Sequence, residues 1–262
     1  MQLNEQNYFS READAKYFSA SQIKAFKRCE ASAMASLCGQ HERSMSQALM
    51  VGQYVDAGLT GDLCAWEHEH PEIRKRDGGL KAEFVQAEEM VQRAMRDPLF
   101  MDYMTGDHQT ILTAPILGGY WFKAKFDVLG ADRIVDLKTV KDLSAKYLPG
   151  QGRVDFATAW DWPLQMAIYQ KVAEENGLGR LPCYLAVITK ETPPDIRIVQ
   201  IEQERMDAEI AWLEQVLPRY EAVKSGAIDP ERCEACEWCR QSRILMGPEL
   251  LGDFDENGGI EG

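Results

Sequence analysis

The stretch "FDVLGADRIVDLKTV", Phe126–Val140, decides the fold of this chain. Apolar residues lie on both sides of Gly130-Ala131-Asp132, a combination that marks a tight turn, so the stretch predicts a β-hairpin. In its second strand Asp136 and Lys138 are two residues apart, and side chains at that spacing point to the same face of a sheet. The hairpin therefore carries a carboxylate and an ammonium group together on a strand that should be largely buried.

The pairing of the two strands brings a second carboxylate to the same place. If the turn is centred on residues 131 and 132, residue i faces residue 263 − i, which sets Asp127 opposite Asp136. The same register sets Lys125 opposite Lys138. Cross-strand partners lie about 4.5–5.5 Å apart at Cβ, where two like charges reduce stability. A divalent cation between the carboxylates removes that cost. If the register were shifted by one residue, Asp127 and Asp136 would not face each other.

Two interpretations of these residues differ in what they require. An ion pair on an edge strand explains Asp136 and Lys138 alone, but the added carboxylate of Asp127 favours a metal site. Carboxylate and carbonyl oxygens are the ligands that Mg²⁺ (or Mn²⁺) prefers, and such a metal polarises phosphoryl oxygens and activates water. A lysine beside it can orient the water and offset charge on a phosphate. The pattern predicts phosphodiester hydrolysis, with Asp127, Asp136 and Lys138 as catalytic residues.

Helical and extended patterns alternate along the rest of the chain. Apolar residues at helical spacing predict helices at 19–37, 44–59, 79–97, 163–177 and 202–226, the last interrupted near Pro218. Apolar runs bounded by turn residues predict strands at 110–116, 120–129, 134–139, 183–190 and 196–201. Residues 147–162 contain Pro and Gly breaks and are expected to form a loop.

This order predicts an α/β fold with a mixed central β-sheet flanked by helices and a helical N-terminal part. We expect one domain over residues 1–248 rather than two. Its helical part should lie at about 18–100, its catalytic core at about 108–225 and its Cys-rich end at 229–243. Residues 249–262 contain five acids and no base and are expected to form a mobile tail.

Charge and hydropathy exclude some function classes. The net charge of −13 argues against nonspecific coating of nucleic acid, although residues 119–153 carry seven bases against four acids. The sequence has no run of about 18 apolar residues, so we expect no membrane span, and its N-terminus lacks an apolar signal core. Seven cysteines, an odd number, make a disulfide framework a poor interpretation. These features predict a cytoplasmic protein.

The hairpin resembles that of the PD-(D/E)XK nuclease superfamily, which has a restriction-endonuclease-like core. Asp127 corresponds to the first acid of the motif, preceded by Phe126 instead of the usual proline, and Asp136-Leu137-Lys138 corresponds to D-x-K. The resemblance implies metal ligation by Asp127, Asp136 and the backbone carbonyl of Leu137. A lone D-x-K occurs often by chance, but D-x₈-D-x-K on a predicted hairpin is more specific.

Two helical motifs extend the resemblance to the RecB-like branch. Gln165 and Tyr169 match its Q-x-x-x-Y motif, and the i, i+4 spacing puts both on one helix face, which implies contact with the DNA backbone. The stretch "VGQYVDAGL" resembles an upstream helix motif that often carries a metal-reaching His or Glu; Asp56 stands at that position. The closest similarity is to phage and prophage RecE-type exonucleases, unevenly over residues 18–243.

The cysteines suggest a second metal centre. Cys233, Cys236 and Cys239 follow a C-x₂-C-x₂-C spacing that suits a soft metal, either zinc or an iron–sulfur cluster, and both normally need four ligands. Some RecB-like relatives close a 4Fe-4S cluster with one early and three late cysteines, which implies Cys29 as the fourth ligand. Their late spacing is usually longer, and a compact turn of reduced thiols against Trp238 is the alternative without a metal.

The resemblance implies a Mg²⁺-dependent exonuclease that degrades linear double-stranded DNA from its ends, in the 5′→3′ direction, in a bacterial host or phage-infected cell. It further implies a homo-oligomer that works with a single-strand annealing recombinase. The alternatives are an iron–sulfur RecB-like nuclease of DNA repair or CRISPR adaptation, and a non-catalytic DNA- or protein-binding module on a nuclease fold. A dehydrogenase or a kinase would need a Gly-rich phosphate loop after a strand, and the sequence contains none.

Overall fold

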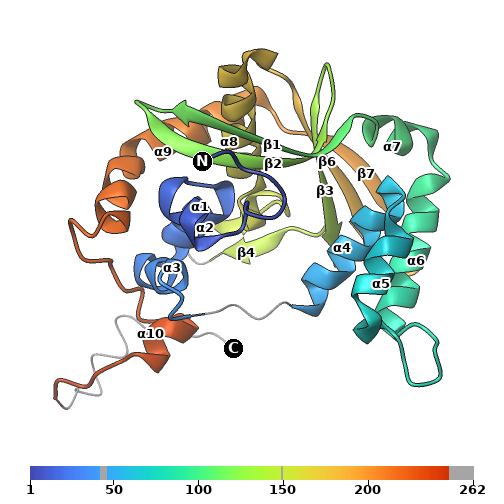
Figure 1. Ribbon diagram of the computed structural model, residues 1–262, viewed down its shortest axis with the longest axis horizontal. Helices are drawn as coiled ribbons and strands as arrows, with labels where there is room; N and C mark the ends of the chain where they lie inside the picture. Colours follow the sequence, from blue (N-terminus) through green and yellow to red (C-terminus); the bar gives the residue numbers. More distant parts are fainter. Residues whose placement is uncertain (42–45, 149, 248–262) are drawn as a thin grey trace.

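The computed structural model describes residues 1–41, 46–148 and 150–247. A five-stranded sheet forms its centre, with strand order β1-β2-β3-β6-β7 (Figure 1). Its strands are β1 (Asp107–Ile116), β2 (Tyr120–Leu129), β3 (Ile134–Val140), β6 (Cys183–Thr189) and β7 (Ile196–Gln200). Only the β3–β6 pair is parallel among these described strands, so the sheet is mixed, as the sequence predicts.

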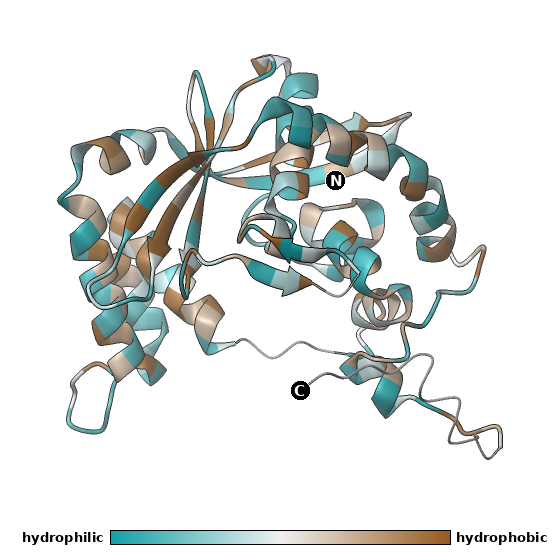
Figure 2. Cartoon of the chain, turned by 180° about the vertical axis from the view of Figure 1, so that it is seen from behind, coloured by the Kyte–Doolittle hydropathy of each residue, from teal (hydrophilic) through white to brown (hydrophobic). Residues whose placement is uncertain are grey.

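Helices cover both faces of the sheet. They are α1 (Arg11–Lys16), α2 (Ala20–Arg28), α3 (Glu30–Leu37), α4 (Gln47–Thr60), α5 (Leu63–Glu69), α6 (Ala82–Met95), α7 (Pro98–Tyr103), α8 (Trp162–Ala173), α9 (Gln203–Lys224) and α10 (Glu237–Gln241). One core layer packs α2, α8 and α9 against the sheet. The other packs α4, α6 and α7 against the opposite face. Figure 2 shows the hydrophobic residues gathered on the strands between these layers. The predicted fold class, a restriction-endonuclease-like α/β core, is confirmed.

The periodicity of the strands explains the two layers. On β3, Ile134 packs into the α8 side and Val135 into the α4 side, as alternate side chains of a strand must. On β6, Leu185 and Ala186 divide in the same way. Both faces of these central strands are apolar, because helices cover both.

Four local differences from the sequence prediction have physical causes. The helix expected at 19–37 divides at Cys29, whose extended backbone ends α2 and whose sulfur caps α3. Helix α9 runs through Pro218 unbroken, because Leu217 and Tyr220 anchor it in the core on both sides. The expected loop at 147–162 contains the hairpin of β4 (Lys146–Leu148) and β5 (Gly152–Val154). Helix α8 begins with Pro163 in its first turn and ends earlier than predicted, before a wide turn in which Gly177 has a φ of 82°.

Some predictions fall on residues outside the described part. Residues 44 and 45, at the start of the helix expected at 44–59, are among them, and the described helix α4 begins at Gln47 with Ser46 as its N-cap. Residue 248 and the tail expected at 249–262 also lie outside it. In the part of the chain that is described, none of the helices has the length and hydropathy to cross a membrane.

Candidate active site

The β2–β3 hairpin has the predicted register. Val128 pairs with Val135 and Leu129 with Ile134, and both pairs obey the 263 − i relation. The backbone N–H of Gly130 donates to the carbonyl of Arg133 (2.9 Å) and closes the turn. Beyond Val128 the described pairing stops at the position where the same register brings Asp127 to Asp136.

The carboxylate of Asp127 takes the place of the missing backbone pairing. Its Oδ2 accepts a hydrogen bond from the backbone N–H of Leu137 (2.9 Å). Burial raises the pKa of Asp127 above its ordinary value, and the negative charge of Asp136 raises it further. Lys138 opposes this shift. Asp127 and Asp136 are therefore close enough to repel each other, as the hairpin argument requires.

A kink in β1 accompanies this arrangement. Gln109 lies opposite Asp127, between the ladder pairs on either side of it, and its φ of 53° is in the left-handed region. A residue with a side chain in that region costs on the order of 1 kcal/mol. The alternation of β2 also breaks here, since Phe126 and Val128 pack into opposite core layers. The sequence offers no turn residue that signals this kink.

Asp136 is almost fully buried, with 2% of its surface exposed. Its Oδ1 accepts a hydrogen bond from Gln165 Nε2 (2.8 Å). Its Oδ2 forms a close ion pair with Lys138 Nζ. The ammonium of Lys138 also lies 5.4 Å from the ring centre of Trp162. The Asp136–Lys138 pair is thus both the predicted ion pair and part of a larger polar group.

Asp56 reaches the same region from helix α4. Its Oδ2 accepts a hydrogen bond from Gln109 Nε2 (2.9 Å), while its buried Oδ1 has no hydrogen-bond partner in the described part of the chain. Burial raises the pKa of Asp56, and Asp136 adds to the shift, whereas His108 and Lys125 oppose it. The structure therefore places Asp56 near the two hairpin carboxylates. Its partner Gln109 is not evident from the sequence.

The donor set fits a divalent cation. Asp56 and Asp127 line one cleft, Asp136 lies within electrostatic range of both, and the buried Asp56 Oδ1 lacks a hydrogen-bond donor among the described residues. Buried charges without partners are unfavourable, and carboxylate oxygens are what Mg²⁺ and Mn²⁺ bind. Leu137 lines the same cleft. Its role as a ligand through the backbone carbonyl stays a prediction.

Gln165 of helix α8 connects Asp136 to a lysine that the sequence analysis missed. Lys24 Nζ donates to Gln165 Oε1 (2.7 Å), and Gln165 Nε2 donates to Asp136. Burial lowers the pKa of Lys24 to about 7, and Lys138 lowers it too, while Asp136 opposes the shift. Lys24 follows the buried Ile23 on an amphipathic helix, where a lysine is usually a solvated surface residue. No signal in the sequence distinguishes it.

Tyr169 lies one turn after Gln165, and both line the cleft, as the shared helix face predicts. Its ring packs against Phe126 with 5.0 Å between ring centres. Burial raises the pKa of Tyr169 well above its ordinary value, and the negative charge of Asp136 raises it further. The hydroxyl therefore stays a neutral hydrogen-bond donor.

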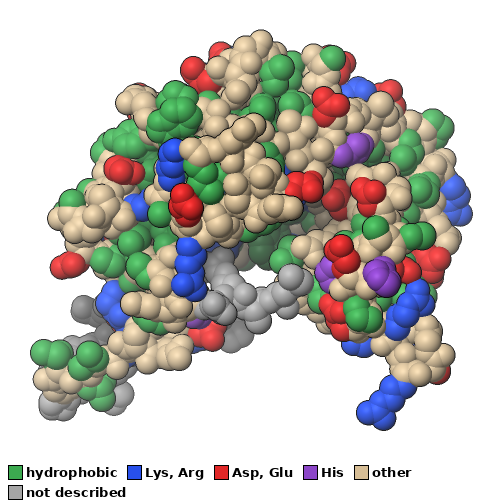
Figure 3. Space-filling view, in the orientation of Figure 1, with side chains coloured by type: hydrophobic (Ala, Val, Ile, Leu, Met, Phe, Trp, Pro, Cys, Tyr) green, Lys and Arg blue, Asp and Glu red, His purple; other side chains and the backbone are tan. Residues whose placement is uncertain are grey.

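The cleft has room for more than a metal. Its volume is about 790 Å³, and Figure 3 shows the molecule hollowed near the centre of this face. The basic residues that line it are Lys24, Lys125, Lys138 and His108, and its aromatic residues are Tyr8, Phe9, Trp66 and Tyr169. Basic and aromatic side chains together suit phosphates and stacked bases. Four carboxylates line the same cleft, those of Asp56, Asp62, Glu69 and Asp127, so its basic groups lie among acids.

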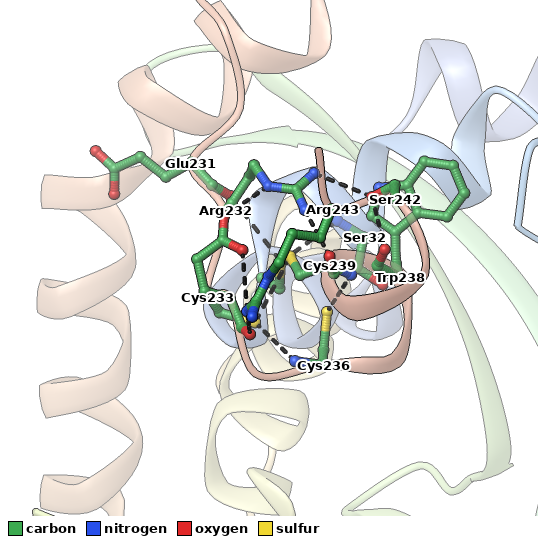
Figure 4. A network of polar contacts seen from close by, with 11 residues as sticks. Ser32, Glu231, Arg232, Cys233, Cys236, Trp238, Cys239, Ser242 and Arg243 are labelled. Carbon is green, nitrogen blue, oxygen red and sulfur yellow. Dashed lines mark hydrogen bonds and ion pairs between the residues drawn. The ribbon is translucent and has the colours of Figure 1, made fainter. Parts of the chain in front are cut away.

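The four cysteines of the predicted second centre also come together. Cys29 lies between α2 and α3, and Cys233, Cys236 and Cys239 lie around the start of α10 (Figure 4). Their sulfur atoms all lie within 4.8 Å of one another, so the group is compatible with a metal site. All seven cysteines of the chain are free thiols.

A mixed sheet whose hairpin brings two acids and a lysine together beside a cleft defines a domain of the PD-(D/E)XK nuclease class. The chain belongs to the family described as "PDDEXK-like domain of unknown function (DUF3799)", whose model matches residues 19–242. It is also similar to a protein from Eubacterium rectale whose crystal structure is described as that of a "Putative exonuclease". The two are 38% identical with a TM-score of 0.92, over 99% of this chain and 100% of that one.

None of the curated proteins matches the chain. The family and the solved structure confirm the predicted superfamily and support a nuclease.

Proposed function

We propose that this protein is a Mg²⁺-dependent (or Mn²⁺-dependent) deoxyribonuclease that acts as an exonuclease on linear double-stranded DNA. One observation carries the proposal: Asp56, Asp127 and Asp136 converge beside Lys138, and the buried Asp56 Oδ1 has no donor among the described residues. That arrangement is unfavourable for folding alone and suits a bound cation.

The residues of the cleft divide the chemistry of phosphodiester hydrolysis among them. Asp127 and Asp136, with Asp56 and the carbonyl of Leu137, would hold the metal, which when bound supplies Lewis acidity and lowers the pKa of water. Lys138, held by its ion pair with Asp136, is placed to orient the attacking water and to offset charge on the scissile phosphate.

Other side chains position the reacting groups and the strand. Gln165 fixes the orientation of Asp136 by donating to Oδ1, which is a more specific role than the backbone contact that the resemblance implies. Tyr169 offers a neutral hydroxyl to the DNA backbone. Lys24 and Lys125 supply positive charge for the remaining phosphates of a bound strand.

The finer features of the activity rest on the resemblance. The RecE-like motifs support 5′→3′ degradation from DNA ends, in phage-type recombination, with a single-strand annealing recombinase as partner. They also support a homo-oligomer in the cytoplasm of a bacterial host or phage-infected cell. The Eubacterium rectale protein, by its description as a "Putative exonuclease", supports attack at ends rather than within the strand.

A nuclease assay with hairpin variants tests the proposal. Linear duplex DNA labelled at either end is incubated with the protein and Mg²⁺, beside a covalently closed circle of the same sequence. Wild type should release nucleotides from the linear form only, and the order of label release gives the direction. Asp136→Ala and Lys138→Ala should each lose at least about 100-fold in rate.

Asp132→Ala is the matched control, because Asp132 is in the same hairpin but its side chain is 77% exposed. It should keep full activity. DNA binding without nucleotide release by wild type would indicate a non-catalytic binding module, and equal activity of Asp136→Ala would place the chemistry elsewhere.

A further inference from the structure

We propose that Cys29, Cys233, Cys236 and Cys239 hold one tetrahedral zinc ion that fastens the C-terminal segment, residues 229–247, to the α2–α3 junction. The proposal does not depend on nuclease activity. Cys29 is about two hundred residues from the others in sequence, yet Cys29 Sγ lies 3.5 Å from Cys239 Sγ, and Cys233 Sγ lies 3.9 Å from Cys239 Sγ. Such distances are too long for a disulfide bond, whose S–S length is about 2 Å.

The size of the group selects a single ion over a cluster. With Zn–S bonds of about 2.3 Å, tetrahedral geometry puts the ligand sulfurs about 3.8 Å apart. In a 4Fe-4S site the iron–sulfide cube lies between the four cysteine ligands and holds their Sγ atoms roughly 6 Å apart. The four sulfurs here all lie within 4.8 Å of one another, so the set matches zinc and is too small for the iron–sulfur cluster that the sequence also allows.

Backbone N–H groups are directed at three of the four sulfurs in the same way. Cys29 Sγ accepts a hydrogen bond from Ser32 N (3.4 Å), three residues later. Cys233 Sγ accepts one from Cys236 N (3.3 Å), and Cys236 Sγ accepts one from Cys239 N (3.4 Å). Donors aimed at a sulfur favour the thiolate form that binds metals. The same bond thus recurs at the N-cap of α3, at the N-cap of α10 and in the turn just before α10, and it directs donors at three of the four sulfurs.

Arginines around the group offset its charge. Four thiolates and Zn²⁺ leave a net charge of −2, which needs compensation when partly buried. Arg232 and Arg243 lie beside the cysteines, as Figure 4 shows. Arg232 donates to the carbonyl of Cys239 (2.6 Å) and to Glu234, while Arg243 donates to the carbonyl of Glu234 (2.8 Å). Glu234, between two of the cysteines, has a φ of 55°, so the ligand loop holds a backbone conformation that few side chains adopt.

The apolar contact between the C-terminal segment and the rest of the domain is small. The core that it shares with α3 consists of Cys29, Ala31 and Cys239, with Cys236 and Trp238 partly buried. Farther along, Ile244, Leu245 and Met246 are exposed. Besides the sulfur group, Glu231 makes polar contacts: its N–H donates to Glu30 Oε2 (2.8 Å), its carbonyl accepts from Ala31 N (3.0 Å), and its carboxylate pairs with Arg219 (3.0 Å). So small an apolar contact does not order a segment alone, and a structural zinc supplies folding free energy directly.

Metal analysis of the full chain tests the proposal. Protein purified without added metal is analysed for zinc and iron by mass spectrometry and by its visible absorption. Wild type should contain one zinc per chain and no colour, and Cys236→Ser should lose at least nine tenths of the metal. Cys38→Ser and Cys64→Ser are matched controls, since both cysteines are exposed and outside the group, and they should keep the zinc.

A second readout covers the case in which Cys236→Ser fails to fold. Wild type treated with a zinc-selective chelator should become much more sensitive to trypsin at Arg232, Arg240 and Arg243, while the rest of the domain stays intact. Stoichiometric iron with visible absorption, or no metal with four reactive thiols, would refute a zinc ion. Unchanged trypsin sensitivity after zinc removal would refute the fastening role.

Discussion

Replacing Asp127 with asparagine should stabilise the metal-free protein while it abolishes metal binding. The change preserves the size and shape of the side chain, and the amide oxygen can still accept the hydrogen bond that Leu137 N donates to Oδ2 (2.9 Å). It removes a buried negative charge that lies beside Asp136, and the new amide N–H can donate toward that residue. Stability and function therefore oppose each other at this position.

The magnitude follows from the geometry of the hairpin. Two carboxylates at a cross-strand separation of about 5 Å repel each other by about 3 kcal/mol at an effective dielectric constant of about 20. Lys138 and the Leu137 N–H reduce this cost. We expect Asp127→Asn to raise the free energy of unfolding by about 1–3 kcal/mol at pH 7, or about 2–4 °C in melting temperature per kcal/mol.

The pH dependence has a definite sign. Because the folded protein raises the pKa of Asp127, the native state binds its proton more tightly than the unfolded state does, and stability falls as pH rises above the ordinary value of 3.8. Asp127→Asn has no ionisable group at this position, so its free energy of unfolding does not fall with pH for this reason. Its advantage over wild type should thus be small near pH 4 and grow with pH until the folded-state pKa is passed.

Chemical denaturation between pH 4 and 8, with and without Mg²⁺, measures both effects. Without metal the variant should be the more stable protein; with metal at about 100 times its Kd, wild type should gain about 2.7 kcal/mol and the variant nothing. Asp132→Asn, which removes an exposed charge from the same hairpin, should change neither. A metal-free Asp127→Asn protein less stable than wild type across this range would refute the facing-carboxylate argument.

Three further predictions concern the residues around the hairpin. Gln165→Leu should lower kcat about 10- to 100-fold with little change in KM, because Asp136 loses the donor that orients it; steady-state kinetics check this. Lys24→Met should flatten the pH dependence of DNA binding, since a pKa of about 7 means that wild type loses this positive charge as pH rises through neutrality; binding titrations in Ca²⁺ from pH 6 to 8 measure it. Asp56→Asn should weaken Mg²⁺ binding, by calorimetry, while it raises metal-free stability, because burial raises the pKa of this carboxyl; unchanged metal affinity would remove Asp56 from the ligand set.

Much of the fold is predictable because its signals are local. The hairpin turn at 130–133, the alternation of β3 and the Pro163 start of α8 all depend on residues within a few positions of one another. The errors occur where packing overrides a local rule. Helix α9 keeps Pro218 in its interior because the apolar face is buried on both sides of it. Helix α2 separates from α3 at Cys29 because the extended backbone of that residue ends α2 and its sulfur caps α3.

The sequence by itself determines the hairpin turn and its register, and the two-residue period of β3 puts Asp136 and Lys138 on one face. The tertiary structure alone decides which distant side chains join them. Lys24 from α2 and Gln109 from the kink of β1 reach this group only because two helical layers close on opposite faces of one sheet. Contacts between residues far apart in the chain depend on that packing, and no spacing in the sequence encodes them.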